Sequence, residues 1–315
     1  MRSVFMDAKY EALFTPWKIG NVEIKNRIVM CPMGGTSLFG WFELGGCHFD
    51  KEAAKLFLER ANNNVGLIIP GIAPLRDTFW GKWLWQNPKM FEELKEFMDE
   101  IHKTGAKLFV QLTAGMGRSW AITELVAPLH KNKITRALIK PVIDTNHELA
   151  CPSPQPSRWA HDIICPEMTV EQIHEISEAF AKTAKLCKEA GVDGVEVHAV
   201  HEGYLLDQFA IEFFNKRTDE YGGSFENRYR FAAEVVKAIK EACGDDYPVS
   251  LRYSVESKMK GFCEGAMPGE DYVEVGRNME ESEKAAKYLQ DMGYDMLNAD
   301  NGTYDSWYWA HPPMY

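Results

Sequence analysis

The 315-residue sequence contains no long hydrophobic run, and no stretch approaches the ~18 consecutive apolar residues of a membrane-spanning helix. The N-terminal segment MRSVFMDAKYEALF has neither the apolar core nor the small-residue cleavage pattern of a secretory signal. Lysine and arginine form no cluster, and the 46 acidic residues outnumber the 35 basic ones, for a net charge of −11. We therefore expect a cytoplasmic protein that binds neither nucleic acid nor an anionic membrane.

The seven cysteines are scattered, and no two of them share a C-x-x-C spacing. An odd number of dispersed thiols in a long acidic chain is typical of a reduced, intracellular protein. Their spacing matches neither a zinc site nor an iron–sulfur site, so we predict no metal centre from them. Two other motifs are also missing. Without G-x-G-x-x-G after the first predicted strand the chain lacks the dinucleotide fingerprint, and without G-x-S-x-G it lacks a hydrolase nucleophile elbow.

What the sequence does contain is an alternation of amphipathic helices and short apolar strands. The helical segments 91–107, 169–194, 229–248 and 281–295 repeat apolar residues at three- and four-residue steps, as a helix lying on a sheet requires. Each ends near a glycine that is typical of a helix stop. The predicted strands are 26–33, 65–72, 106–113, 194–200, 248–254 and 295–302.

Repeated helix–glycine–strand units predict parallel strands, in either an open doubly wound sheet or a (β/α)8 barrel. The missing dinucleotide fingerprint and the polar residues at several strand ends favour a TIM (β/α)8-type barrel, of which six strands are counted. Two long segments, 114–168 and 255–282, interrupt the alternation. We expect the first to lack regular structure, and we expect both to be active-site loops.

Polar residues on one face of successive strands predict a ligand site. Gln111 and Arg252 alternate with apolar neighbours, and Glu196 and His198 share a face in the strand between them. Asn298 and Asp300 likewise share one face of the last predicted strand. Each has a structural alternative: a glutamine that satisfies buried backbone groups, an ion pair of Arg252 with Glu196 or Asp300, and a hydrogen-bonded core histidine at His198. Together they indicate a polar ligand with several hydrogen-bond acceptors.

His198 and His201 also permit a metal interpretation. Their spacing suits zinc, with Glu202 as a third ligand or base, but no further histidine–carboxylate cluster is evident in the sequence. We therefore predict no metal. A barrel hydrolase or lyase that uses the same histidines without a cofactor is a third interpretation.

Four segments resemble one known family. The segments 13–34 (LFTPWKIGNVEIKNRIVMCPMG), 109–112 (FVQL), 191–209 (GVDGVEVHAVHEGYLLDQF) and 215–231 (NKRTDEYGGSFENRYRF) are similar to the old yellow enzyme family of flavin-dependent ene-reductases. The turn segment 215–231 follows a strand that ends in H-x-x-H, and this combination is highly specific for the family. The EGYL form and the long loops look most like the 2-enoate reductase and 2,4-dienoyl-CoA reductase branch, and the sequence leans towards 2-enoate reductase.

The resemblance implies FMN bound over the top of the barrel. Pro32, Met33 and Gly34 match the segment that lies against the flavin ring, and Gly71 falls at the end of the second strand. Gln111 matches the residue that binds the pyrimidine edge. Arg252 matches the arginine beside it, whose positive charge stabilises the anionic reduced flavin.

The resemblance also implies the catalytic residues. His198 and His201 match the pair that binds a carbonyl or carboxylate oxygen of the substrate, and Tyr204 matches the proton donor. The HEGY form carries one residue more than the commoner pattern, and a core tyrosine is the alternative for Tyr204. His311, after the sixth strand, is a candidate second acid. The expected substrate is a small unsaturated carboxylate or thioester, with NADH as the ultimate electron donor.

The resemblance further places two barrel strands and the FMN phosphate site beyond Tyr315, followed by a 4Fe–4S cluster and an FAD/NADH domain. Residues 1–315 are thus expected to form a single incomplete FMN-binding barrel, truncated at its C-terminus. Such a barrel exposes two strand edges, so we expect low stability or association into a homo-oligomer, and weak FMN binding. The alternative function is an inactive fragment that serves only as a folding or interaction piece.

Overall fold

The computed structural model describes residues 8–40 and 46–306. The chain begins with a 3-10 helix, η1 (Ala8–Phe14), and an antiparallel hairpin of β1 (Trp17–Ile19) and β2 (Val22–Ile24). This hairpin lies beside the start of the main sheet, on which Ile19 and Ile24 pack with Leu67 and Phe109. The sequence patterns used above did not predict it.

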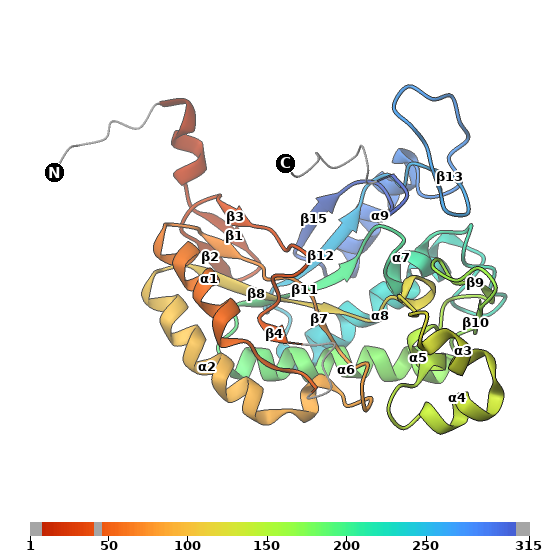
Figure 1. The fold of residues 1–315 in the computed structure, drawn as a ribbon. Coiled ribbons are helices and arrows are strands. Elements are labelled where there is room, and N and C mark those ends of the chain that lie inside the picture. The colour runs from red at the N-terminus through yellow and green to blue at the C-terminus, as the bar shows by residue number, and fades with distance from the viewer. Residues whose placement is uncertain (1–7, 41–45, 307–315) are drawn as a thin grey trace.

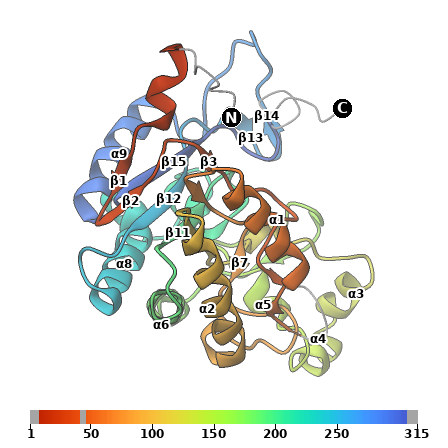
Figure 2. The same ribbon diagram turned by 90° about the vertical axis from the view of Figure 1, so that its left-hand side faces the viewer.

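Six parallel strands form one curled, open sheet (Figures 1 and 2). In space they run in the order β15-β12-β11-β8-β6-β3, and the short β7 (Ala73–Pro74) pairs with the end of β8. Each strand falls inside one of the six predicted segments. Their bounds are β3 (Val29–Met30), β6 (Leu67–Ile68), β8 (Lys107–Thr113), β11 (Gly194–Ala199), β12 (Val249–Ser254) and β15 (Met296–Asp300).

The result is an α/β half-barrel consistent with the predicted TIM-type fold. Along the part of the chain that the structure describes, β3 and β15 form the two ends of the sheet and do not pair with each other. In the same residues, no helix is long and apolar enough to cross a membrane.

Helices cover the outer face of the sheet (Figure 1). They are α1 (Lys51–Asn62), α2 (Pro88–Lys103), α6 (Val170–Glu189), α8 (Phe225–Cys243) and α9 (Met279–Met292). The last four are those that the sequence predicted. Most of these helices have an N-cap side chain whose oxygen accepts a hydrogen bond from a backbone N–H of the first turn. Thr169 caps α6 in this way, and Ser224 caps α8. The predicted stops are confirmed, because Gly244 after α8 and Gly293 after α9 both take positive φ angles.

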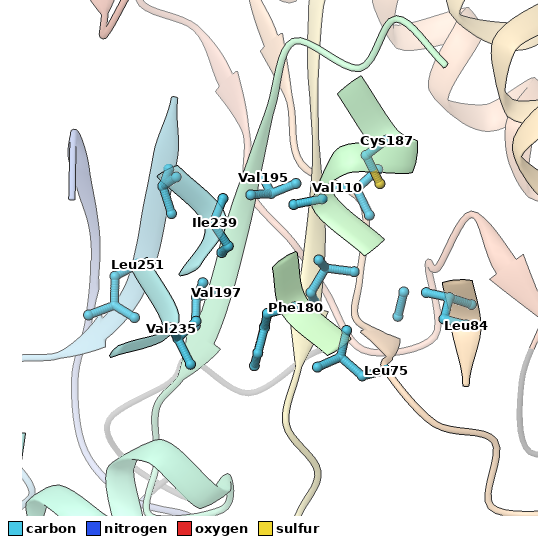
Figure 3. Close-up of a cluster of buried hydrophobic side chains, with 14 of the residues drawn as sticks. Leu75, Leu84, Val110, Phe180, Cys187, Val195, Val197, Val235, Ile239 and Leu251 are labelled. Atoms are coloured by element: carbon cyan, nitrogen blue, oxygen red, sulfur yellow. The ribbon is translucent and has the colours of Figure 1, made fainter. Parts of the chain in front are cut away.

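The core lies between this sheet and its helices (Figure 3). Val195 and Val197 of β11 pack with Phe180 of α6 and Val235 of α8, and all four side chains are fully buried. Burial of one such side chain contributes roughly 1.5–3 kcal/mol to folding. The apolar strand face therefore points to the helices, as predicted, which turns the polar strand face inward.

The prediction that 114–168 lacks regular structure is wrong. The segment folds around its own small core, with Trp120, Leu149 and Cys151 among its buried residues. Asn132 and Asp144 cap the N-termini of two of its helices. Their side chains accept hydrogen bonds from backbone N–H groups, and this stabilises the start of a helix in a polar segment. Its elements are η3 (Gly117–Ser119), α3 (Val126–Lys131), α4 (Lys133–Ile139), α5 (Thr145–Glu148), β9 (Gln155–Pro156) and β10 (Ile164–Cys165).

Short elements complete the fold. Segment 255–282 carries a β13–β14 hairpin before α9 begins. The remaining elements are β4 (Phe39–Gly40), β5 (His48–Phe49), η2 (Leu84–Gln86), α7 (Leu205–Ala210), β13 (Met259–Gly261) and β14 (Glu264–Gly265).

Candidate active site

Four neighbouring strands bring their inward polar residues together around Glu196. The Glu196 carboxylate accepts hydrogen bonds from Gln111 Nε2 at 2.8 Å, from Ser250 Oγ at 2.8 Å and from Asn298 Nδ2 at 3.1 Å. Burial raises the pKa of Glu196, and these three donors oppose that shift. Sequence reasoning placed Glu196 on the inward face but did not identify it as the centre of the network.

Arg252 extends this network to the carboxyl end of β15. Its Nη1 donates to Asn298 Oδ1 at 2.9 Å, and its Nη2 forms an ion pair with Asp300. Of the two partners considered from the sequence, the structure shows Asp300. Because a guanidinium carries five N–H donors, Arg252 keeps donors beyond these two bonds.

His201 also contacts the Asp300 carboxylate. Its Nε2 lies 3.2 Å from Asp300 Oδ2. Burial alone would raise the pKa of Asp300, but the hydrogen bond with His201 and the charges of His201 and Arg252 hold that pKa well below its ordinary value. Asp300 of β15 therefore contacts both His201, which follows β11, and Arg252 of β12.

His198 and Tyr204 face each other at the carboxyl end of β11. Their ring centroids are 4.0 Å apart, with an interplanar angle of 72°. Burial, reinforced by the charges of His201 and Arg252, lowers the pKa of His198 well below its ordinary value, so the ring is neutral at pH 7. Its Nδ1 is buried and has no hydrogen-bond partner within the described residues. A buried polar atom without a partner is uncommon in folded proteins and requires an explanation.

The turn after β11 fixes Tyr204. His201 and Glu202 take left-handed backbone angles, with φ of 64° and 57°, which is unusual for residues other than glycine. The Glu202 amide donates to Asp207 Oδ2 at 2.7 Å and holds this conformation. A Cβ on Gly203 would lie 2.1 Å from the ring of Tyr304, so only glycine lets that ring approach.

Tyr304, which follows β15, contacts the proposed proton donor. Burial raises the pKa of Tyr204, and a hydrogen bond with Tyr304 partly offsets that rise. Tyr204 therefore keeps its phenolic proton at neutral pH. Tyr304 also donates its backbone amide to the His201 carbonyl at 3.2 Å. Sequence reasoning placed the residues after the last strand near the site through His311, but it assigned no role to Tyr304.

A second buried network, also missed, surrounds Glu202. Arg118 Nη1 donates to Glu202 Oε1 at 2.8 Å, and Arg158 forms an ion pair with Oε2. Arg158 also donates to Asp305 Oδ1 at 2.5 Å. The guanidinium of Arg118 is fully buried, 4.4 Å from the centre of the Phe262 ring. Both carboxylate oxygens of Glu202 are thus engaged by arginines, in place of the metal role considered from the sequence.

The residues predicted to face a flavin lie where β3 and β6 end. Pro32, Met33 and Gly34 follow β3, and Met33 is 53% exposed. A Cβ on Gly71 would lie 2.4 Å from the Met33 carbonyl oxygen, so the two segments are in close contact. Cys31 Sγ lies 4.0 Å from Asn298 Oδ1 and links this corner to the Arg252 network. The last candidate, His311, lies outside the described residues.

Comparison with known proteins identifies the family of this chain. The model of the NADH:flavin oxidoreductase / NADH oxidase family matches residues 12–305. The chain belongs to this family. Membership confirms the resemblance to old yellow enzymes, and the family name implies FMN and NAD(P)H as its cofactors.

Two relatives align with nearly the whole of this chain. A cinnamate reductase of Clostridium sporogenes is 45% identical and is matched over 98% of this chain, but over 44% of its own length. An NADH oxidase of Thermoanaerobacter brockii is 34% identical over 93% of this chain and 40% of its own length. The chain thus spans less than half the length of these relatives. The first supports the predicted likeness to 2-enoate reductases.

Two solved structures share the fold of this chain. A 2-naphthoyl-CoA reductase complex superposes with a TM-score of 0.73 at 26% identity, covering 94% of this chain and 41% of that one. The old yellow enzyme of Pichia sp. AKU4542 superposes with a TM-score of 0.67 at 27% identity, covering 95% of this chain and 73% of that one.

Proposed function

We propose that this chain is the substrate-reducing module of an FMN-dependent ene-reductase. It reduces the activated C=C bond of an α,β-unsaturated carboxylate or its thioester, with NADH as the ultimate electron donor. The observation that carries the proposal is the pairing of His198, whose buried Nδ1 has no partner in the described structure, with Tyr204 at the end of β11. The 45% identity to a cinnamate reductase supports the same class of substrate.

The residues present fit FMN. Gln111 of β8 and Arg252 of β12 offer amide and guanidinium donors on the inward face of the sheet, on either side of β11, and such donors suit the acceptor-rich pyrimidine edge of a flavin. The exposed Met33 and the open surface at Gly34, where an added Cβ would meet no atom within 4 Å, leave room for a flat ring. When bound, FMN supplies the hydride that adds to the substrate β-carbon.

The side chains of this chain prepare the substrate for that hydride. Neutral His198 donates an N–H to the carbonyl or carboxylate oxygen, and this polarises the double bond towards its β-carbon. His201, oriented by Asp300, borders the same position. The burial of both imidazoles excludes water from the oxygen and strengthens the hydrogen bond.

Tyr204 completes the reaction by protonating the α-carbon. Its raised pKa keeps the phenolic proton available at neutral pH, and Tyr304, its hydrogen-bond partner, stabilises the phenolate left behind. One hydride at the β-carbon and one proton at the α-carbon give the saturated product.

The test is to purify the chain and to look for flavin absorbance and for FMN released on denaturation. The same preparation is then reduced with NADH or dithionite and mixed with cinnamate as a model 2-enoate. We expect the chain to take up added FMN and to form the saturated acid. A preparation that folds, takes up no added FMN and reduces no 2-enoate would instead favour the alternative of an inactive interaction piece.

A further inference from the structure

The hydrogen bonds around Glu196 have a fixed direction, and Arg252 sets it. A guanidinium can only donate, so the side-chain oxygen of Asn298 must face Arg252, whose Nη1 lies 2.9 Å away. The Nδ2 of Asn298 must then face Glu196, where it lies 3.2 Å from Oε1 and 3.1 Å from Oε2. Both carboxyl oxygens of Glu196 therefore meet an N–H donor of the same amide.

The other two partners leave no place for a proton on Glu196. Gln111 Nε2 lies 2.8 Å from Oε1, and Ser250 Oγ lies 2.8 Å from Oε2. A proton on Oε1 would face the N–H groups of both amides, and a proton on Oε2 would face that of Asn298. Burial raises the pKa of Glu196, but these donors favour the ionised carboxylate.

This negative charge has no cation in direct contact. Glu196 is fully buried, and in the part of the chain that the structure describes its hydrogen-bond partners are three neutral side chains. Arg252 reaches it only through Asn298, and Asp300 already forms an ion pair with Arg252. A buried carboxylate without its own cation is costly, so stability does not explain its position. Arg252 thus lies between two carboxylates.

The charge of Glu196 also acts on the segment proposed to face the flavin. Cys31 immediately precedes Pro32 and Met33. Burial raises the pKa of the Cys31 thiol, the charge of Arg252 opposes that rise, and the negative charges of Glu196 and Asp300 add to it. Glu196 and Arg252 therefore act on this segment with opposite sign.

We propose that Glu196 is a positioning residue that makes the bound flavin a stronger reductant, an inference that rests on the FMN site of the proposed function. Its carboxylate opposes the positive charge of Arg252, which by itself favours the anionic reduced form. It also turns the Gln111 amide, so that the oxygen of that amide is left for a ligand N–H. A stronger reductant suits a C=C bond activated by a carboxylate, because a carboxylate withdraws electrons more weakly than an aldehyde or a ketone.

The test is the two-electron midpoint potential of FMN bound to the full chain, measured by reduction against a reference dye. Glu196→Gln keeps the size of the side chain, and its amide nitrogen can face Ser250, whose hydroxyl then accepts. Loss of the charge should raise the affinity for reduced FMN relative to oxidised FMN by about tenfold, which is an upward shift of ~30 mV for a two-electron couple. Glu196→Asp keeps the charge and should stay closer to the wild-type potential.

Glu234→Gln is the matched control, because Glu234 belongs to α8, on the outer face of the sheet, where it accepts a hydrogen bond from Tyr221 Oη at 2.8 Å. It should keep the wild-type potential. The assignment is overturned if Glu196→Gln has the wild-type potential or a lower one, or if Glu196→Asp shifts it as far as Glu196→Gln.

An infrared difference spectrum keeps the assignment testable if Glu196→Gln fails to fold. The difference between the wild type and Glu196→Asp should lie in the carboxylate region, and a protonated-carboxyl band in the wild type would overturn the assignment. An unchanged potential in a chain that still reduces 2-enoates overturns this assignment alone. The expected shift in a chain that reduces no 2-enoate disproves the proposed reaction and leaves the role of Glu196 standing. A folded chain that takes up no added FMN overturns both.

Discussion

The Nε2 of His201 lies 3.2 Å from the Oδ2 of Asp300, although about 100 residues separate them in the sequence. His201 belongs to the turn after β11, whereas Asp300 ends β15, and β12 lies between these two strands. Arg252 of β12 pairs with the same carboxylate. One aspartate thus sets the position of a proposed substrate-binding histidine and of a proposed flavin-binding arginine.

Asp300→Asn should weaken both functions at once. The amide still fills the space but cannot form an ion pair with Arg252 or His201, so we expect kcat/KM for a 2-enoate to fall about 10- to 100-fold, the loss of one hydrogen bond to a charged group. FMN should also be bound less tightly. Steady-state kinetics and a flavin titration measure the two effects. Unchanged values in both would show that Asp300 is only structural.

The same substitution should change the acid limb of the stability curve. The pKa of Asp300 is depressed in the folded protein, so its contribution to stability is present above the ordinary aspartate pKa, near 3.9, and is lost as the pH falls through that region towards the folded value. The free energy of unfolding should therefore fall more steeply below pH 5 in the wild type than in Asp300→Asn. Urea unfolding at pH 3 to 6 tests this, and parallel curves would contradict it.

Glu202→Gln should destabilise the fold. Removal of the carboxylate leaves Arg118 and Arg158 as buried charges that have lost their shared partner, and breaking a buried ion pair typically costs about 3–5 kcal/mol. The matched control is Glu226→Gln, which removes an exposed pair with Lys284 and should leave the urea midpoint almost unchanged. Equal midpoints for the two variants in urea unfolding would mean that this network contributes little to stability.

Much of the architecture could be predicted because it depends on local periodicity. The strand that contains Val195 and Val197 and the helix that packs on it both follow from apolar spacing. Inward placement of Gln111 and Arg252 follows from the same alternation, since side chains point to opposite faces of a strand. The contact of Arg252 with Asp300 was one of two options, and only the three-dimensional register of β12 and β15 decides between them.

The rest depends on contacts between residues far apart in the sequence. Arg118 and Arg158 lie in the segment 114–168, which the sequence predicted to be a loop without regular structure, yet both converge on Glu202. Tyr304 reaches Tyr204 only because Gly203 leaves room for its ring. Hydrophobic periodicity does not predict such contacts between distant side chains.

Glu148→Gln should change how stability varies with pH. Burial raises the pKa of Glu148 to about 7, although the charge of Arg76 and the hydrogen bond from Thr78 oppose the shift, whereas Asp144 and Asp77 add to it. The unfolded chain loses this proton near pH 4.3, so ionisation of Glu148 disfavours the folded state increasingly from about pH 4.3 to 7. The variant should therefore gain stability relative to the wild type between pH 5 and 8, by an amount on the order of 3 kcal/mol at most. A pH-independent difference in urea unfolding would disprove the shift.

Tyr204→Phe separates a proton donor from a packing residue. Phenylalanine keeps the ring contact with His198 but has no proton to give, so we expect kcat for a 2-enoate to fall by about 10² to 10⁴. Affinity for the saturated product acid should change less than about threefold, because the proposed oxygen contact is made by His198. Stopped-flow kinetics and calorimetry measure the two quantities. Tyr294→Phe is the matched control, since it removes a buried hydroxyl that bonds the Ala232 carbonyl away from the site, and it should leave kcat unchanged. A normal kcat in Tyr204→Phe would identify Tyr204 as a core tyrosine and assign protonation to another group.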